Sequence, residues 1–435
     1  MVRQPGPARR GRGTRRGPGP GARGRAGPRG RPGGRRTRTA GAVTVRVGVF
    51  GLLGSGNLGN DGSLEAVLGF LRAEHPYAKV SAFCGGADTV QARYGIPAVR
   101  LNWYRGEYRH ASGLRSIVTK GFGKIIDVFR TAWWVRRQNV VIVPGMGVLE
   151  ATLPLRPWGF PYALFLLSLC GRLGRTKIAL VSVGADRIRV PATRFLVRSA
   201  SQLATYRSYR DELSRSAMAN MGVRVTNDRV YPDLAFALPT PAAVEDPRAV
   251  GVGVMAYYGG NDDRARGEEI YRAYVDAMTE FVRYLVSQDR PVRLFIGDRI
   301  DQEVVDEIVE TVASPLISAA VPGTLDELMR SMAEVGTVVA TRYHNVLCAL
   351  KAGRPTVAIG YAKKNDVLMA EMGLGEFCQE ARAVEVPRLI EQFEEVQRRA
   401  PELKAELAAR NEACGQQLKD QFALLSRTLI PAEVS

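Results

Sequence analysis

The segment VVATRYHNVLCALKAGRPTVAIGY, residues Val338 to Tyr361, gives the clearest indication of the fold class of this chain. It begins with an apolar, β-branched run, continues through a segment with helical spacing, and enters a second apolar run at Thr356. Two apolar strands joined by a helix predict a parallel β-α-β unit whose strands are covered on both faces. Arg342 and His344 follow the first strand directly, at the sheet edge where parallel α/β sheets bind ligands.

The same alternation of apolar runs and helical segments extends outward in both directions. It predicts an α/β chain with two parallel sheets, and 435 residues are enough for two domains with full-sized cores. The predicted strands are residues 43–51, 79–84, 140–144, 177–183, 203–208, 250–257, 292–297, 335–340 and 356–360. The predicted helices of the second half are residues 268–287, 302–313 and 345–352.

Domain boundaries follow from changes in composition. The proline-rich stretch LPTPAAVEDPRA has no periodicity and separates the two sets of strands. We predict a first domain at residues 42–238, a linker at 239–248 and a second domain at 249–387. Residues 388–435 form a highly charged segment with a helical pattern, which is typical of a tail that packs back across two domains.

The net charge of +18 is concentrated near the N-terminal end. Residues 1–41 contain thirteen arginines, no lysine and no acidic residue, which leaves +5 on the other 394 residues. This Gly/Pro/Arg tract has too few apolar side chains to form a core and is predicted to be a disordered tail. It is either a nonspecific arm for RNA or anionic membrane, or a dispensable extension. The mildly basic remainder argues against a nucleic-acid-binding protein.

The five cysteines are scattered and form no CxxC pair. This pattern argues against a disulfide scaffold and a structural zinc site, and it favours a reducing compartment, the cytoplasm. The longest apolar stretch, residues 160–169, is far shorter than the roughly 20 residues that span a bilayer. The chain is therefore predicted to have no integral membrane segment.

Residues 116–138 allow two interpretations, because apolar side chains alternate there with Lys and Arg. The pattern fits a basic amphipathic helix that lies on an anionic membrane, peripheral to its inner face. It fits a core helix with a solvated basic face equally well.

The first candidate site is the loop GLLGSGNLGNDGSLEA, residues 51–66. Glycines such as Gly54 permit positive φ and close approach of a ligand, and the following helix offers N–H groups to an anion. The spacing matches neither the dinucleotide-binding nor the P-loop motif. Asn57, Asn60 and Asp61 add polar side chains at the carboxyl end of a predicted strand, where such sheets bind ligands.

Three further segments carry candidate residues. Arg342 supplies a planar fork for carboxylate or phosphate, and His344 is suited to proton transfer near neutral pH. Arg210 follows a predicted strand at the start of a helix. Gly145 and Gly147 end another buried strand and leave the backbone open to a ligand. No His, Cys and Asp cluster suggests a metal site.

Five segments in this order resemble the motifs of the polysaccharide pyruvyl transferase family. They are residues 54–61, 144–149, 210–214, 341–344 and 352–355. Their counterparts are a G-x-G-N-x-G-D-E-like loop, a Gly-rich turn, an R-D-E-x-S helix start, an R-x-H turn and an A-G-x-P segment. Tyr361 and Lys363 also fall where the family tends to have a Tyr followed by a Lys. The resemblance covers roughly residues 44–375.

The resemblance implies two Rossmann-like lobes facing a cleft, similar to the GT-B glycosyltransferase fold. It implies transfer of a pyruvyl group from phosphoenolpyruvate, a co-substrate and not a bound cofactor, to hydroxyls of a cell-surface polysaccharide, its precursor or a lipid-linked saccharide. Arg342 and Arg210 would hold the anionic groups of the donor, and His344 would transfer a proton. Asp61 would orient or deprotonate the acceptor hydroxyl, and the loop glycines would leave room for the sugar.

Three departures from the family motifs keep alternatives open. Asn60 stands where the family has Asp, with Asp61 one position later, the Gly-rich turn reads Pro-Gly-Met-Gly, and the middle residue of the R-x-H turn is Tyr343. The alternatives are a GT-B-type glycosyltransferase that uses a sugar nucleotide, and a noncatalytic binding relative.

Overall fold

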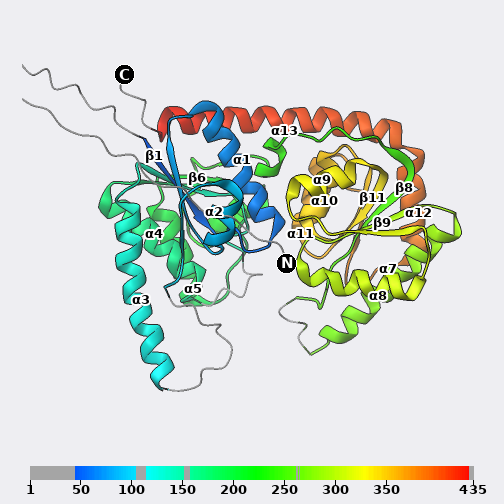
Figure 1. Ribbon diagram of the computed structural model, residues 1–435, viewed down its shortest axis with the longest axis horizontal. Coiled ribbons are helices and arrows are strands. Elements are labelled where there is room, and N and C mark those ends of the chain that lie inside the picture. Colours follow the sequence, from blue (N-terminus) through cyan, green and yellow to red (C-terminus); the bar gives the residue numbers. More distant parts are fainter. Residues whose placement is uncertain (1–44, 104–113, 151–156, 261–262, 264, 431–435) are drawn as a thin grey trace, which may run out of the picture. The chain divides into compact units, whose positions relative to one another are not determined.

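The computed structural model describes residues 45–103, 114–150, 157–260, 263 and 265–430, without the side chains of residues 114–120. The predicted disordered tail, residues 1–41, lies outside these ranges. Two parallel sheets with helices between their strands make up the described chain, which confirms the predicted α/β class (Figure 1). Each sheet belongs to one half of the chain.

The first sheet has the strand order β3-β2-β1-β4-β5-β6-β7, and all its strands are parallel. β4 (VVIVP) is buried along its whole length, as expected for a central strand covered on both faces. The strand bounds are β1 Arg46–Gly51, β2 Lys79–Cys84, β3 Ala98–Arg100, β4 Val140–Pro144, β5 Lys177–Val183, β6 Tyr206–Tyr209 and β7 Arg229–Val230. The helices are α1 Leu58–Glu74, α2 Ala87–Tyr94, α3 Leu114–Val135, α4 Phe160–Gly174, α5 Pro191–Leu203, α6 Glu212–Asn220 and the 3-10 helix η1 Leu234–Ala237.

The second sheet has the order β10-β9-β8-β11-β12-β13, again with parallel strands. Its strands are β8 Asp246–Gly253, β9 Val292–Phe295, β10 Ile317–Ala320, β11 Val335–Ala340, β12 Thr356–Gly360 and β13 Cys378–Glu380. Its helices are α7 Gly267–Ser287, η3 Arg299–Asp301, α8 Gln302–Val312, α9 Leu325–Ala333, α10 Tyr343–Lys351 and α11 Lys363–Glu371.

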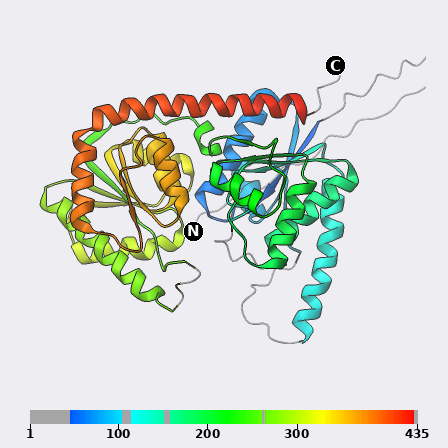
Figure 2. The ribbon, with the colours of Figure 1, turned by 180° about the vertical axis from the view of Figure 1, so that it is seen from behind.

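The C-terminal segment forms α12 (Val386–Arg398) and α13 (Ala400–Thr428), and α13 runs along both halves (Figures 1 and 2). The buried Gln421 of α13 hydrogen-bonds Ser182 at 3.0 Å and Ser208 at 2.7 Å in the first half. Asn411 of the same helix donates to the carbonyl of Leu350 in the second half at 2.9 Å. The last helix therefore connects the two sheets.

Five predicted strands agree with the structure to the residue, namely β2, β4, β5, β11 and β12. β8 differs, because it begins at Asp246, inside the stretch predicted as linker, and ends at Gly253. Pro247 cannot donate a ladder hydrogen bond, and a register shift opposite it, between Val335 and Thr337, accommodates it in the strand. The short strands β3, β7, β10 and β13 carry too few residues for a sequence pattern and were not predicted.

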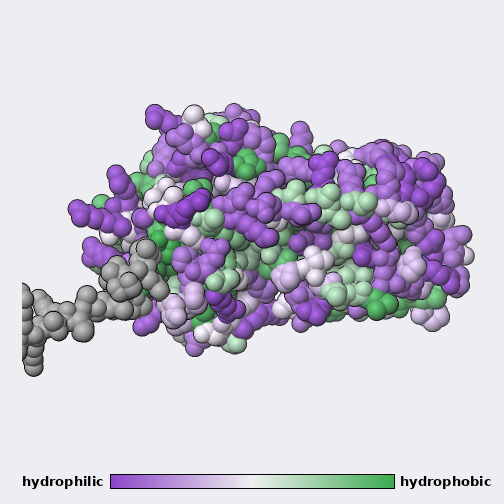
Figure 3. Space-filling model, turned by 90° about the horizontal axis from the view of Figure 1, so that it is seen from above, coloured by the Kyte–Doolittle hydropathy of each residue, from purple (hydrophilic) through white to green (hydrophobic). Residues whose placement is uncertain are grey.

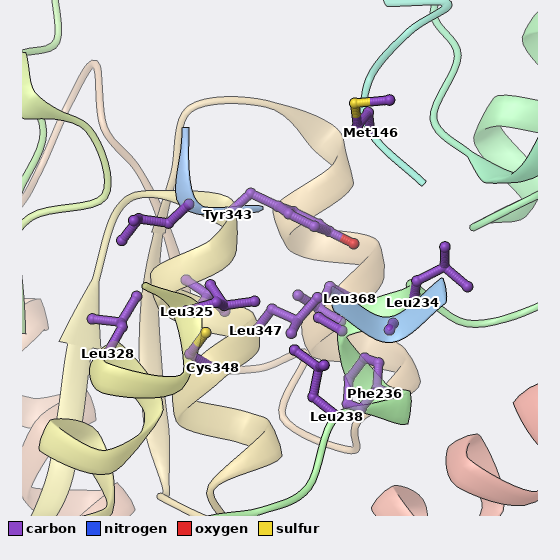
Figure 4. Close-up of a cluster of buried hydrophobic side chains, with 14 of the residues drawn as sticks. Met146, Leu234, Phe236, Leu238, Leu325, Leu328, Tyr343, Leu347, Cys348 and Leu368 are labelled. Carbon is purple, nitrogen blue, oxygen red and sulfur yellow. The ribbon is translucent and has the colours of Figure 1, made fainter. Parts of the chain in front are cut away.

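In each sheet, the strands on the two sides of the earliest strand in the chain are added in opposite directions, so the strand order has a reversal point. In the first sheet the reversal lies between β1 and β4, and in the second between β8 and β11. At such a point the loops leave the sheet on opposite faces and open a crevice at the carboxyl ends of the strands. Buried apolar side chains from both halves, among them Met146, Leu234, Tyr343 and Leu347, form one cluster beside these ends (Figure 4).

No helix in the part of the chain that the structure describes is long and apolar enough to cross a membrane.

Candidate active site

A cavity of about 690 Å³ lies where the loops of both reversal points meet. Its lining includes residues that follow β1, β4 and β6 in the first half and β8, β9, β11 and β12 in the second. We call these two sets the first wall and the second wall. Those of interest are Asn57, Asn60, Gly147, Glu150 and Arg210 on the first wall, and Tyr258, Asp298, Arg342, His344, Tyr361 and Lys364 on the second.

Arg342 lines the cavity from the end of β11, where it is the N-cap residue of α10. Its Nε and Nη2 donate to the two carboxylate oxygens of Asp301 at 2.9 and 2.6 Å. Asp301 is fully buried and also accepts backbone N–H groups, including that of Ala256 at 3.0 Å. One edge of the guanidinium is thus fixed, while the side chain stays 21 % exposed toward the cavity.

His344 lies in the first turn of α10 and lines the cavity. Its ring packs against Gly59 of α1 so closely that a Cβ on this glycine would lie 2.0 Å from Cε1. Burial is the main cause that lowers the pKa of His344 to about 4. Asp233 and Glu150 act on this pKa in the opposite direction, and the cations Arg210 and Lys364 act in the same direction as burial. The imidazole is therefore neutral at pH 7 in the unliganded protein.

Lys364, and not the predicted Lys363, lines the cavity after β12. Lys363 is the exposed first residue of α11 and faces a smaller neighbouring cavity. The Lys364 Nζ lies 3.0 Å from Oε2 of Glu150, on the opposite wall. Burial disfavours its charge, but Tyr361 and Glu150 outweigh that effect and raise the pKa of Lys364. Tyr361 itself lines the cavity, and its ring centre lies 5.3 Å from the Lys364 ammonium.

Arg210 is held on the first wall by a set of carboxylates, with only 3 % of its side chain exposed. It pairs with Glu150, and it lies 3.5 Å from both Asp211 and Asp233. Its guanidinium also lies 4.5 Å from the ring centre of Tyr343. These groups raise the pKa of Arg210 despite its burial, so it remains charged.

Glu150 is a cavity residue that the sequence reasoning missed. It follows the Gly-rich turn after β4, and it bridges Arg210 and Lys364. Burial would raise its pKa, but these two cations outweigh burial and lower the pKa of Glu150 to about 2. The only signal in the sequence is an acidic residue shortly after a Gly-x-Gly turn, and nothing there identifies its partners.

The Gly-rich loop after β1 places two of its three polar side chains at the cavity. Asn57 caps α1 by accepting from the N–H of Asn60 at 3.2 Å, and both residues line the cavity. Asp61 is buried instead and is absent from the lining. It accepts the N–H of Gly54 at 2.6 Å and lies 3.6 Å from Arg93. Burial raises the pKa of Asp61 in spite of both contacts.

The glycines of these loops allow neighbouring groups to pack directly against the backbone, where a side chain would collide with them. Gly54 has φ +69°, and a Cβ there would lie 2.4 Å from the carbonyl oxygen of Gly86. Gly145 has φ +41° and packs on Ser63, away from the lining. Gly147 does line the cavity, and a Cβ on it would collide with the Glu150 carboxylate.

The second wall also presents the N-termini of two helices. The N-cap residues of α10 and α11, Arg342 and Ala362, make no side-chain capping hydrogen bond. Both N-cap residues line the cavity, so the positive ends of these helix dipoles favour an anion there. Among the described residues, no group of His, Cys, Asp and Glu has an arrangement that could hold a metal ion.

Comparisons with known structures support the fold assignment. The putative UDP-N-acetylglucosamine 2-epimerase from Listeria monocytogenes aligns with a TM-score of 0.58 at 11% identity, over 88% of this chain and 96% of that one. The UDP-GlcNAc 2-epimerase from Neisseria meningitidis aligns with a TM-score of 0.57 at 12% identity, over 88% and 100%. MurG from Acinetobacter baumannii gives 0.50 at 11% identity, over 88% and 100%. These neighbours show a GT-B-type fold, as expected.

None of the curated proteins matches the chain. The family model described as polysaccharide pyruvyl transferase matches residues 57–363, which is most of the chain and includes the cavity residues from Asn57 to Tyr361. The protein is therefore a transferase that belongs to the polysaccharide pyruvyl transferase family.

Proposed function

We propose that the cavity binds phosphoenolpyruvate and transfers its carboxyethylidene unit to two hydroxyls of a saccharide, with release of phosphate. The observation that carries this proposal is the convergence of Arg342, Lys364 and His344 at the uncapped N-termini of α10 and α11. A donor with a carboxylate and a phosphate needs several cationic groups and N–H donors, and this wall supplies them.

We assign binding of the donor to the second wall, chiefly to Arg342 and Lys364. Arg342 keeps N–H groups beyond the two that Asp301 accepts, because a guanidinium carries five. Lys364 adds a second charge near Tyr361. Arg210 also lines the cavity, but its contacts are three carboxylates, so we propose that it holds the first wall together and does not bind the donor itself.

The proposed reaction balances as follows. The methylene carbon of phosphoenolpyruvate gains one proton and becomes a methyl group, C2 bonds to two sugar oxygens, and the C2–O bond to phosphate breaks. Of the two protons that the hydroxyls lose, one compensates for the proton added to the methyl group and the other leaves with phosphate. We propose that His344 donates the proton to the methylene carbon.

A neutral His344 cannot supply that proton until the donor is bound. A bound anion close to the ring favours the imidazolium, so its pKa of about 4 should rise on binding. Binding is then accompanied by proton uptake near neutral pH. Calorimetric titration of phosphoenolpyruvate in buffers of different ionisation enthalpy measures this uptake, and a binding heat that is independent of the buffer would contradict the role of His344.

The proposed acceptor subsite lies on the side of Tyr258. This residue lines the cavity, is 41% exposed, and stacks on Tyr271 with ring centres 4.7 Å apart. An exposed aromatic face fixed by stacking suits the apolar face of a sugar ring, and the nearby Glu268 and Asp298 can accept hydroxyl protons. Asp61 is not part of this proposal, because it already binds Gly54 and Arg93; we propose that it shapes the loop.

The decisive experiment measures phosphate release from phosphoenolpyruvate with a pool of saccharide acceptors. We expect His344→Ala to reduce turnover by about 10²- to 10⁴-fold. His75→Ala is the matched control, because His75 lies at the far end of α1 and contacts Ser426; it should keep wild-type turnover. A folded His344→Ala protein with full activity would remove the residue from the mechanism.

Two alternatives predict different results, one in a thermal-stability measurement and the other in the phosphate-release assay. A sugar-nucleotide glycosyltransferase would be stabilised against heat by UDP-GlcNAc and not by phosphoenolpyruvate. A noncatalytic relative would release no phosphate with any acceptor. We propose that the reaction takes place in the cytoplasm, where phosphoenolpyruvate is produced, on a precursor of a cell-envelope polysaccharide.

A further inference from the structure

A stripe of large apolar side chains runs along the exposed side of α3. Phe122, Ile125, Phe129 and Trp133 are 60%, 56%, 70% and 55% exposed. Their spacing of three and four residues places them on one face of the helix, over about three turns. We call these four residues the α3 stripe.

The α3 stripe is not needed to attach the helix to the protein. The opposite side of α3 makes the contacts with the core through the buried Asp127, Thr131 and Trp134. Trp134 stacks on Phe83 of β2 with ring centres 5.3 Å apart. Of the two interpretations of this segment, a core helix with a solvated basic face does not fit, because the exposed face carries the largest apolar residues.

The helices beside α3 extend the same surface. α3 packs on α4 and α4 packs on α5, so the three form one layer (Figures 1 and 2). Leu173 at the end of α4 and Phe195 on α5 are 74% and 63% exposed. By contrast, the face seen in Figure 3, along α13, is mostly hydrophilic.

The charge on this layer is almost entirely positive. The sequences of α3, α4 and α5 contain one acidic residue, Asp127, which is buried and paired with Arg130 at 3.1 Å and Lys124 at 3.6 Å. The exposed cations on and beside these helices are Arg136, Arg137, Arg172, Arg175, Arg194 and Arg198. The guanidinium of Arg137 lies 3.5 Å from the ring centre of Trp133, so a cation sits directly beside the stripe.

We infer that the α3–α5 layer docks on an anionic phospholipid bilayer, with the α3 stripe inserted at the level of the acyl-chain boundary. Aromatic side chains with adjacent arginines fit the membrane interface, where the rings enter the apolar region and the cations contact phosphate headgroups. The absence of an exposed carboxylate from these three helices removes the charge that an anionic surface would repel. A docked enzyme would meet a lipid-linked acceptor at the surface that carries it.

Vesicle co-sedimentation with the full-length protein tests this inference. Vesicles that contain phosphatidylglycerol should bind the protein, and vesicles of phosphatidylcholine alone should bind it weakly. The double variant Phe122→Ser/Phe129→Ser should bind roughly 10- to 100-fold less, because two inserted rings are lost. Tyr77→Ser and Val321→Ser are matched controls, since both residues are exposed singly, at 75% and 65%, outside the α3–α5 layer; they should bind like the wild type.

The arginine-rich tail, residues 1–41, is identical in all of these proteins, and a cationic tail adds binding to anionic vesicles by charge alone. The comparison is therefore repeated in 0.5 M salt, which screens the tail but not inserted rings. Phe129→Ser alone is the fallback if the double variant misfolds by circular dichroism. Quenching of tryptophan fluorescence by brominated lipid should be strong in the wild type and mostly lost in Trp133→Phe.

Equal vesicle binding of wild type and the stripe variants at high salt would overturn the inference, as would quenching that is as strong in Trp133→Phe as in the wild type. A concentration-dependent dimer without lipid that disappears in Phe122→Ser/Phe129→Ser would also overturn it, because the stripe would then be covered by a second copy of the chain.

Discussion

The two walls of the cavity carry similar residue types, but their arginines differ in burial and in the number of carboxylate partners. On the first wall, Arg210 is almost completely buried and faces three carboxylates, those of Glu150, Asp211 and Asp233. On the second wall, Arg342 has one carboxylate partner, Asp301, and remains partly exposed. The charge of Arg210 is therefore compensated within the protein, as is that of Lys364 through Glu150, whereas Arg342 keeps N–H groups that are available to a ligand.

This difference separates two tasks that the sequence alone could not distinguish. A buried cation with several carboxylates holds the wall together, because losing it would leave these carboxylates close together in a dry environment with too little positive charge beside them. A partly exposed cation fixed along one edge can exchange water for substrate with little rearrangement. Variants that alter one wall at a time distinguish the two tasks.

The largest effect is expected from Arg210→Met. Removal of the cation leaves Glu150, Asp211 and Asp233 close together with only Lys364 as a compensating charge, so the free energy of unfolding should fall by about 3–5 kcal/mol. Urea denaturation measures this. Arg215→Met is the control, because Arg215 pairs with Glu212 at the surface, where solvent screens the pair, and its loss should change stability little. Equal losses in both variants would show that Arg210 is not a structural centre.

The next largest effect is expected from Gly59→Ala. The added methyl would occupy the place of the His344 ring and displace it from the cavity. A misplaced proton donor should reduce turnover about 100-fold with unchanged secondary structure. Gly69→Ala in the same helix meets no neighbour within 4 Å and should raise helix stability by about 1 kcal/mol or less without changing turnover. Full activity of Gly59→Ala would mean that the ring position is unimportant.

As the pH falls, the free energy of unfolding should first decrease because of His344, and only at lower pH because of Glu150. The pKa of His344 is lowered to about 4, below its unfolded value, so the unfolded chain binds a proton that the folded protein does not. Stability should therefore fall as the pH drops from about 6.5 to 4, by about 1–2 kcal/mol between pH 7 and 5 for a partly exposed ring. Glu150, with its pKa lowered to about 2, loses its contribution only below about pH 4.5.

Chemical denaturation of the wild type and His344→Gln at pH 7 and pH 5 checks that order. The variant should lack the decrease in the free energy of unfolding between these two pH values. Saturating phosphoenolpyruvate should make this decrease smaller in the wild type too, because the bound anion favours the protonated ring. An unchanged slope in His344→Gln would assign the pH dependence to other groups.

The smallest effect is expected from Arg342→Lys. An ammonium cannot keep the two-point contact with Asp301 and also reach the ligand, so the affinity for phosphoenolpyruvate should fall about tenfold. The fold should be little affected, because Asp301 retains backbone donors, among them the N–H groups of Ala256 and Asp298. Titration calorimetry measures the affinity. Unchanged affinity would move the donor site away from Arg342.

The parts of the site that the sequence predicted best lie at the ends of strongly apolar strands. Arg342 and His344 were predicted at the start of a helix after a buried strand, and both line the cavity there. Strand ends are well defined because the apolar runs are long, and a β-α-β unit places their carboxyl ends on one edge.

The contacts that the sequence could not predict join distant segments or depend on local packing. Glu150 and Arg210 are sixty positions apart, so no local pattern pairs them. Lys363 and Lys364 differ by one step of a helix, and only the packing of α11 decides that Lys364 faces the cavity. Asp61 was predicted to face the acceptor, but the turn at Gly54 directs its carboxylate to that backbone N–H instead.

The position of α13 in the chain has a consequence for biosynthesis. Its Gln421 and Asn411 attach to opposite halves of the protein, and α13 is synthesised after all strands of both sheets. Each sheet can assemble earlier during translation, while the helix that contacts both of them follows later. We expect a nascent chain halted before residue 400 to carry folded sheets without the helix that connects them.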